Sequence, residues 1–377
     1  MTAPTIDRMA DRIAVVGIVG AGTMGAGIGQ VALEAGHEVV LYDVDEVARE
    51  RGVERIRDGL ARRAAKLDLD ADAVDDWVEG RLANVRHAHT LEALGAEAGL
   101  GIVIEAAAEL LDLKQDVFRA LDASTEPDVI LATNTSSLSV TAIAEACQAP
   151  DRVIGAHFFN PAPVMRLVEV VPGSSTSDAT TTATISVLRA WGKVPVRSAD
   201  TPGFIVNRVN RPFTIEALRI LEEGEAGVGH IDRAIRGAGF RMGPFELMDL
   251  TGIDITFAAA TAIWERLGHP DRLRPSPIQQ QLVEVGHLGR KTGHGFYDYS
   301  SDPPGWPDPG YPSVSDALGP LDPDAIVRRI RGAILDEARL AAAEHVASEE
   351  DIDRALTLGA AHPQGPFAWA REHPATG

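Results

Sequence analysis

Short apolar runs alternate with helix-like stretches through the first half of the chain. The run Ile13–Val19 is rich in β-branched residues and carries no charge, which predicts a short buried strand. The next stretch, Thr23–Ala35, predicts a helix that ends at Gly36. A second apolar run, Val39–Tyr42, predicts another strand. Strand, helix and strand in this order predict a βαβ unit with two parallel strands.

Three further apolar runs follow, each separated from the next by a helix-like stretch. They are Ile102–Glu105, Val129–Ala132 and Val153–Gly155. Strands that read as continuous apolar runs are typical of a parallel sheet covered by helices on both faces. We therefore expect residues 1–200 to form an α/β domain with a doubly wound, mostly parallel sheet.

The pattern changes after Gly203. Long amphipathic stretches replace the short apolar runs from Ile205 onward, which predicts an all-α domain over residues 201–300. Residues 301–322 contain six prolines, a composition that favours an extended linker over a packed helix. We expect a second helical segment over residues 323–377.

An internal repeat relates the two helical segments. Four short motifs of the first segment recur in the second, in the same order and at nearly constant spacing. The pairs are Ile205–Arg208 (IVNR) with Ile326–Arg329 (IVRR), Glu216–Ala217 with Glu337–Ala338, Ile231–Ala234 with Ile352–Ala355 (both IDRA), and Gly243–Phe245 with Gly365–Phe367 (both GPF). A helical unit has therefore been partly duplicated.

Composition excludes several classes of protein. The chain has 35 basic and 55 acidic side chains and a net charge of −20, so we expect no general affinity for nucleic acid or an anionic membrane. Any anionic ligand needs a local cluster of basic residues. The single cysteine, Cys147, excludes an intrachain disulfide and has no neighbours at metal-ligand spacing. We expect a buried thiol there, and no metal site.

The start of the chain predicts a cytoplasmic protein. It lacks the charged-then-apolar order of a secretory signal and the acid-poor, arginine-rich character of a transit peptide. The uncharged stretch Ile13–Leu33 has the length of a membrane span, but six glycines dilute its apolar content. We therefore do not expect it to be a membrane helix.

A glycine motif lies where the first predicted strand turns into the first helix. In Gly20–Gly25 (GAGTMG), the first glycine permits a tight turn, the second lets a pyrophosphate approach, and the third brings the helix close to the sheet. Asp43, at the end of the next strand, can accept hydrogen bonds from both ribose hydroxyls and repel a 2′-phosphate. These features predict a Rossmann-type domain that binds NAD in preference to NADP. The predicted contacts in the motif are Gly20, Gly22, Thr23, Met24 and Gly25.

His157 and Glu169 are the residues most suited to acid-base chemistry. Oxidation of an alcohol by hydride transfer needs a base for the hydroxyl proton, and an imidazole is suited to this role near neutrality. Glu169 is placed to bond the other ring nitrogen and to stabilise the imidazolium that forms. The alternative is that His157, among phenylalanines and prolines, is a core residue.

Two polar residues are candidates for substrate contact. Ser136 follows the apolar run Val129–Ala132, so it lies at the carboxyl edge of the predicted sheet, where ligands bind. Its alternative role is to cap a helix. Asn207, early in the helical domain, can polarise a substrate oxygen through its amide. Its alternative role is that of an ordinary polar residue on a helix.

Taken together, these segments resemble the L-3-hydroxyacyl-CoA dehydrogenase family, including its short-chain 3-hydroxybutyryl-CoA members, over nearly the whole chain. The resemblance implies that His157 is the catalytic base, that Glu169 is its partner, and that Ser136 and Asn207 bind and polarise the substrate. The motifs that carry it are Gly20–Gly27 (GAGTMGAG), Asn134–Leu138 (NTSSL), His157–Pro161 (HFFNP), Thr201–Arg208 (TPGFIVNR) and Gly289–Tyr297 (GRKTGHGFY).

The resemblance also implies two sets of ligand contacts. Glu109 and Lys114 match positions that line the nicotinamide end of the family's cofactor site, although a salt bridge on a helix surface explains such a pair equally well. Arg62, Arg63 and Lys66 occupy the region that meets the CoA phosphates in the family, and a solvated helix face is the alternative.

The expected function is therefore NAD-dependent, reversible oxidation of an L-3-hydroxyacyl-CoA to the 3-ketoacyl-CoA. One alternative is oxidation of a free hydroxy acid such as L-gulonate, and another is a redox-silent NAD-binding or structural protein. Arg328 stands in the second helical copy where Asn207 stands in the first, so we expect one active site per chain. The resemblance implies a homodimer, or a monomer if the second copy replaces the partner's domain.

Overall fold

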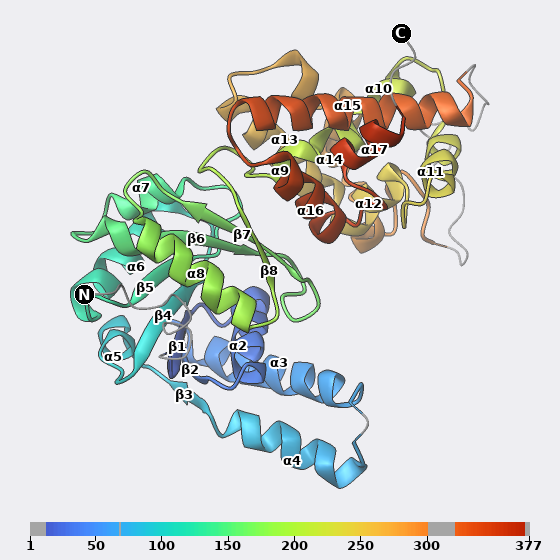
Figure 1. Ribbon diagram of the computed structural model, residues 1–377. Coiled ribbons are helices and arrows are strands. Elements are labelled where there is room, and N and C mark those ends of the chain that lie inside the picture. The colour runs from blue at the N-terminus through green and yellow to red at the C-terminus, as the bar shows by residue number, and fades with distance from the viewer. Residues whose placement is uncertain (1–12, 68, 301–320, 374–377) are drawn as a thin grey trace. The chain divides into compact units, whose positions relative to one another are not determined.

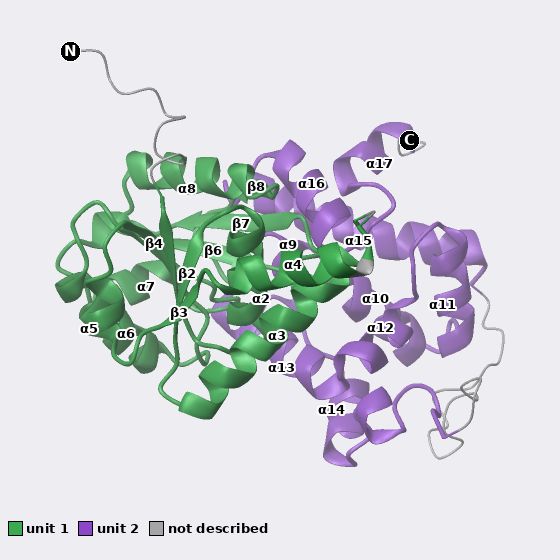
Figure 2. Cartoon of the chain, turned by 90° about the horizontal axis from the view of Figure 1, so that it is seen from below, with its two compact units in different colours: residues 1–204 green, residues 205–377 purple. Residues whose placement is uncertain are grey.

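The computed structural model describes residues 13–67, 69–300 and 321–373. They divide between two compact units, residues 1–204 and residues 205–377 (Figure 2). The first unit carries an eight-stranded sheet, and the second is built from helices (Figure 1). The division falls within the Thr201–Arg208 motif, close to the point at which the short apolar runs end.

The sheet of unit 1 has the strand order β3-β2-β1-β4-β5-β6-β7-β8. Its neighbouring strands are parallel, except that β6 and β7 are antiparallel. Because the chain winds outward in both directions from the β1–β4 pair, the predicted doubly wound α/β fold is confirmed. The strands are β1 (Val15–Val19), β2 (Glu38–Tyr42), β3 (Val85–His87), β4 (Leu100–Glu105), β5 (Ile130–Thr133), β6 (Val153–Phe158), β7 (Leu167–Pro172) and β8 (Val194–Arg197).

Helices cover both faces of this sheet. Val16 and Ile18 of β1 belong to a core that also holds residues of α2, α3, α4 and α8, whereas Val15 and Val19 belong to a core with residues of α5, α6 and α7. This alternation follows from the strand period of two residues. The helices are α2 (Thr23–Glu34), α3 (Glu46–Ala64), α4 (Ala71–Leu82), α5 (Leu91–Gly95), α6 (Leu111–Ser124), α7 (Val140–Ala144) and α8 (Asp178–Ala190).

Cys147 is half-buried, not buried as the sequence suggested. Its thiol lies 3.7 Å from the carbonyl oxygen of Phe118 on α6. Burial, together with the negative charge of nearby Asp122, raises the pKa of this thiol to about 12, so the thiol stays protonated near neutrality. Cys147 is therefore a packing residue at the edge of the core.

Unit 2 is all-α among the described residues, apart from short 3-10 turns and isolated bridges. No single described helix is long and apolar enough to cross a membrane, and only the bent pair α12 and α13 passes that test jointly, with a bend of 102°. The helices are α9 (Val206–Val209), α10 (Arg211–Glu222), α11 (Val228–Gly237), α12 (Pro244–Thr251), α13 (Ile253–Arg266), α14 (Pro277–Glu284), α15 (Pro323–Ala343), α16 (Glu349–Gly359) and α17 (Pro366–Glu372).

The two helical copies repeat the same local structure. Asp232 on α11 accepts hydrogen bonds from the first two available amides of α12, and Asp353 on α16 does the same for α17. A Cβ atom at Gly243 or Gly365 would lie within 2.4 Å of the corresponding aspartate. The recurrence of the GPF motif therefore has a steric cause, because only glycine fits beside the capping carboxylate.

Reciprocal ion pairs join the two copies where α9 and α10 pack against α15. Arg208 of the first copy donates to Glu337 of the second at 2.8 Å, and Arg329 of the second donates to Glu216 of the first at 2.6 Å. Since the repeat relates Arg208 to Arg329 and Glu216 to Glu337, each copy presents the same arginine and the same glutamate to the other. This is the pattern of an isologous interface, contained here within one chain.

Residues 301–320 of the predicted linker lie outside the described residues. Its last two residues lie directly before α15. Leu321 donates its amide to the carbonyl oxygen of Glu225, and Asp322 caps α15 by accepting from the amide of Ala325. Helix α15 itself begins at Pro323, the first residue of the predicted helical segment, and its cap, Asp322, is the last residue of the predicted linker.

The two reciprocal ion pairs differ in burial, so substitution of each arginine tests how burial affects the contribution of an ion pair to stability. Arg208 and Glu337 are both only 1% exposed, so Arg208→Met leaves a buried carboxylate with fewer partners and should cost about 3–5 kcal/mol of unfolding free energy. Arg329 is more exposed, and Arg329→Met should cost about 1 kcal/mol or less. Urea unfolding followed by circular dichroism measures both values. Equal losses in the two variants would contradict the assignment of the buried pair.

Candidate active site

The glycine motif forms the turn between β1 and α2. Gly20 has a φ of +97°, and a Cβ there would lie 2.7 Å from the carbonyl oxygen of Ala106. A Cβ at Gly25 would lie 1.8 Å from the carbonyl oxygen of Gly20. In contrast, a Cβ at Gly22 would meet no atom within 4 Å. The first and third glycines are therefore required by the fold, whereas the second keeps the space beside the turn open.

This open space has the features of a dinucleotide site. Helix α2 has no side chain that caps its first amides, so these amides are directed at the space where a pyrophosphate binds in such folds. Asp43 follows β2, and its carboxylate accepts from the amide of Ala21 at 2.8 Å and from the amide of Asp45 at 3.1 Å. The residues present therefore fit a dinucleotide, with Thr23 and Met24 in the first turn of the helix.

His157 and Glu169 lie directly opposite each other on the antiparallel strands β6 and β7. The His157 Nδ1 atom is 2.7 Å from Glu169 Oε2, and the two residues are 7% and 0% exposed. A carboxylate only accepts, so Nδ1 carries the proton and Nε2 is left as the basic nitrogen of the neutral ring. The rings of Phe159 and Phe204 pack against the imidazole, with centroid distances of 4.6 and 5.8 Å.

Ser136 lies in the loop that follows β5, at the carboxyl edge of the sheet. Glu109 organises this loop, because its Oε1 atom accepts from the Thr135 hydroxyl at 2.7 Å and from the amides of Ser136 and Ser137 at 2.9 and 3.0 Å. The helix-capping alternative for Ser136 is wrong, since Ser139 caps α7.

Glu109 is held in its charged form. Burial alone would raise the pKa of this carboxyl, but the hydrogen bond from Thr135, the charge of Lys114 and the bonds from Ser136 and Ser137 outweigh it and lower the pKa. The segment Asn134–Leu138, which follows β5, is called the serine loop. A fixed negative charge therefore lies directly beside Ser136. Neither the spacing nor the composition of the sequence indicated that Glu109 and the serine loop are in contact.

Lys114 is not the surface residue that the salt-bridge alternative required. It is 1% exposed, and its Nζ atom lies 2.6 Å from Glu105 Oε1 and 3.4 Å from Glu109 Oε2. Glu105, the last residue of β4, is fully buried and also accepts from Thr133 at the end of β5. Glu105 is not among the residues predicted from the sequence, although a lone charge at the end of an apolar strand indicates a buried polar group with a partner.

These groups share one edge of the sheet. Gly20, Glu105, Thr133 and His157 lie at or next to the carboxyl ends of β1, β4, β5 and β6. The strand order reverses between β1 and β4, which is where doubly wound sheets bind their ligands. The amide oxygen of Asn134 accepts from the Phe158 amide at 2.8 Å and so ties the serine loop to the histidine strand.

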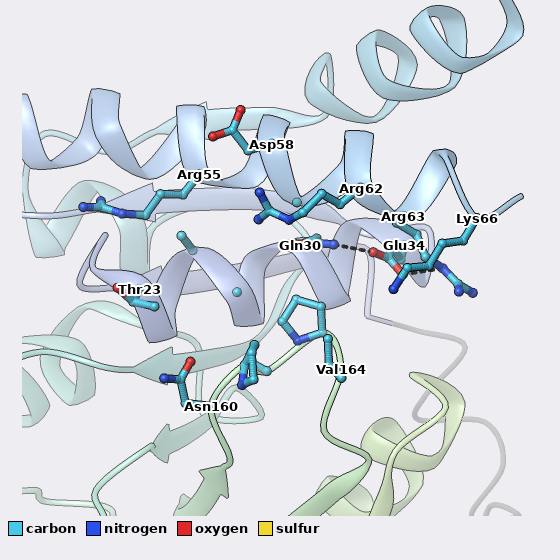
Figure 3. A pocket seen from close by; sticks show the side chains of 16 residues that line it. Thr23, Gln30, Glu34, Arg55, Asp58, Arg62, Arg63, Lys66, Asn160 and Val164 are labelled. Carbon is cyan, nitrogen blue, oxygen red and sulfur yellow. Dashed lines mark hydrogen bonds and ion pairs between the residues drawn. The ribbon is translucent and has the colours of Figure 1, made fainter. Parts of the chain in front are cut away.

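The basic cluster on and just after α3 lines a cavity of about 520 Å³ within unit 1. Figure 3 shows Arg55, Arg62 and Arg63 on α3, with Lys66 just beyond the end of that helix. The figure also labels Asn160 and Val164 on the loop after β6. Four cationic side chains line it, against two acidic ones, in a chain whose net charge is strongly negative. The lining cations are Arg55, Arg62, Arg63 and Lys66, and the acids are Glu34 and Asp58. Arg62, Arg63 and Lys66 are exposed, as both a phosphate contact and a solvated helix face require.

Asn207 lies on α9 of unit 2, and Arg328 occupies the related position on α15. Among the residues that the structure describes, no group of three or more histidine, cysteine, aspartate or glutamate side chains is placed to hold a metal ion.

Comparisons with known proteins agree over both units. The 3-hydroxyacyl-CoA dehydrogenase NAD binding domain matches residues 15–201, and the C-terminal domain of the same family matches residues 203–299 and 326–373. The chain is 36% identical to the 3-hydroxyadipyl-CoA dehydrogenase of Escherichia coli K12, over 95% of this chain and 90% of the relative. It is 42% identical to the mitochondrial hydroxyacyl-coenzyme A dehydrogenase of Rattus norvegicus, over 75% of this chain and 90% of the relative.

A solved structure gives the same result. The 3-hydroxybutyryl-CoA dehydrogenase of Escherichia coli K12 superposes with a TM-score of 0.85 at 35% identity, covering 96% of this chain and 92% of that one. The glycine turn, the histidine–glutamate pair and both sequence matches lead to the same conclusion: the chain belongs to the 3-hydroxyacyl-CoA dehydrogenase family.

Proposed function

We propose that this protein oxidises an L-3-hydroxyacyl-CoA reversibly to the 3-ketoacyl-CoA, with NAD as the acceptor. The observation that carries the proposal is the buried pairing of His157 with Glu169, in the same unit as the dinucleotide turn. A carboxylate that bonds Nδ1 orients the ring and leaves Nε2 as the base, as alcohol oxidation requires. NAD, when bound, supplies the hydride acceptor.

The proposed proton transfer follows from this geometry. His157 Nε2 takes the hydroxyl proton of the substrate while the carbinol carbon loses its hydride, so the C–O bond becomes a carbonyl. The imidazolium that forms is stabilised by Glu169, which lies 2.7 Å from Nδ1. Ser136 is assigned to the substrate oxygen, and Glu109 holds the Ser136 loop in place. For Asn207 we propose the polarising role that the family resemblance implies.

A thioester of CoA is favoured over a free hydroxy acid by the cavity on α3. Its excess of cationic side chains suits the phosphates of CoA, which a free sugar acid lacks. The relatives act on acyl groups that include 3-hydroxyadipyl and 3-hydroxybutyryl chains, according to their names. We assign this protein to the same substrate class.

We also propose that the helical domain does not pair with a second chain, so that the protein is a monomer. The reciprocal pairs Arg208–Glu337 and Arg329–Glu216 place α15 on α10 as an identical partner would place its own helix. A surface whose ion pairs are already made within the chain is no longer available to a second copy of the protein.

His157→Gln tests the base. Acid-base catalysis by a side chain contributes about 10²-fold to 10⁴-fold, so turnover of acetoacetyl-CoA should fall by that factor, while the affinity for NADH is retained. Steady-state absorbance at the NADH band and a fluorescence titration of NADH measure the two quantities. His89→Gln, an exposed histidine of the same unit, is the control and should retain turnover. Unchanged turnover in His157→Gln would remove His157 from the mechanism.

Asp43→Ser tests the choice of cofactor. The serine removes the charge that repels a 2′-phosphate, so the ratio of kcat/KM for NAD to that for NADP should fall by about 10-fold or more. Asp45→Ser is the matched control, since serine also caps helices and Asp45 caps α3. An unchanged ratio in Asp43→Ser would show that another residue selects the cofactor.

The mass of the protein in solution tests the monomer. Light scattering after size-exclusion chromatography should give the mass of a single chain, 40.1 kDa. Twice that mass would mean that a dimer interface survives elsewhere. In that case Arg208→Met separates the two interfaces, because it weakens only the internal one.

A further inference from the structure

Lys193 is a buried cation without a carboxylate partner at ion-pair distance among the described residues. It lies directly before β8 and is 8% exposed. Its Nζ atom donates to two main-chain carbonyls, that of Ala162 at 2.5 Å and that of Met165 at 2.9 Å. Most lysines keep their ammonium group in water. The burial of Lys193 therefore indicates that its two hydrogen bonds hold a nearby segment in place.

The two carbonyls belong to the loop of residues 159–166, which joins β6 to β7. Its internal bonds are few: the amides of Val164 and Met165 both donate to the carbonyl of Pro161, and its two prolines donate nothing. The carbonyls of Ala162 and Met165 need donors because they are turned into the protein. Lys193 satisfies both and so determines where the loop lies.

The same loop is a wall of the basic cavity. Residues 160–164 line the cavity, together with residues of α2 and α3 (Figure 3). Helix α2 meets the loop at Gly27, where a Cβ would lie 3.3 Å from both the Ala162 Cβ and the Pro163 Cδ. The wall is therefore held between two contacts, with Gly27 on the α2 side and Lys193 on the other.

Keeping Lys193 in this position has a cost. Burial lowers the pKa of its ammonium group to about 8, and the nearby charge of Glu34 offsets only part of that shift. A methionine would occupy a similar volume without this cost. The presence of a buried cation at this position is therefore better explained by its role in holding the loop than by a contribution to the stability of the core.

We propose that Lys193 is a positioning residue for the CoA portion of the substrate. It fixes the 159–166 loop against α2 and thereby keeps the cavity open beside Arg62, Arg63 and Lys66. Lys193 does not touch the substrate and acts only through the loop. The proposal rests on the proposed function, because it takes the ligand of this cavity to be CoA.

The test compares two thioesters that carry the same acyl group. Acetoacetyl-CoA has the nucleotide and its phosphates, whereas the acetoacetyl thioester of N-acetylcysteamine lacks them. In Lys193→Met, KM for acetoacetyl-CoA should rise by about 10-fold or more, while KM for the short thioester and KM for NADH stay within about twofold. Lys193→Arg, which retains charged donors, should recover most of the KM for acetoacetyl-CoA.

Gly27→Ala supplies an independent second variant. The added methyl group crowds the 159–166 loop from the α2 side. It should therefore raise KM for acetoacetyl-CoA without changing KM for the short thioester. Lys291→Met, which alters an exposed ion pair with Asp254, is the control and should leave all three constants unchanged. Thermal unfolding of each variant establishes that it is folded, and Lys193→Gln replaces Lys193→Met if the latter is not.

Two outcomes would overturn the proposal. An equal rise of KM for both thioesters would mean that Lys193 acts on the reaction centre or on the whole unit, and unchanged constants would mean that the loop does not depend on it. Failure of the proposed function is seen separately, because the wild-type protein would then not turn over acetoacetyl-CoA. Calorimetric titration with free CoA would still compare the cavity in the wild type and in Lys193→Met.

Discussion

The geometry of the active site depends on the pairing of β6 with β7, the antiparallel pair in a sheet whose other neighbouring strands are parallel. In an antiparallel pair, residues that face each other share one side of the sheet, and this register sets His157 against Glu169. A shift by one residue would turn Glu169 to the other face and leave a buried imidazole without its acceptor. The geometry of the proposed base is therefore a consequence of strand register, stabilised by the apolar residues that bury both strands.

A second constraint comes from the buried charges at the strand ends. Glu105 and Lys114 form a buried ion pair. Lys114 also lies within ion-pair distance of Glu109 Oε2, and the other carboxylate oxygen of Glu109 accepts hydrogen bonds from amides of the serine loop. Each of these groups would be expensive to bury alone, but together they are satisfied. The serine loop, the cofactor edge and the histidine strand are thus linked through one polar network, with Asn134 as the tie to β6.

Much of this could be predicted from the sequence, because local patterns carry the information. The glycine turn, the doubly wound sheet and the duplicated helical unit follow from spacing and periodicity over short stretches. What could not be predicted depends on contacts between distant residues. Nothing in the sequence shows that Glu109 accepts from the serine loop, that Lys114 is buried against Glu105, or that Lys193 supports a loop about one strand and one helix earlier in the chain. These contacts exist only once the sheet brings the segments together.

Whether His157 can act as the base depends on which ring nitrogen carries the proton, and nitrogen NMR of histidine-labelled protein reports this directly. We predict that the neutral ring of the free enzyme carries its proton on Nδ1, with Nε2 unprotonated, and that Glu169→Gln weakens this preference because the carboxylate acceptor is gone. A neutral ring protonated on Nε2 would contradict the account, since that nitrogen is needed to receive the proton of the substrate.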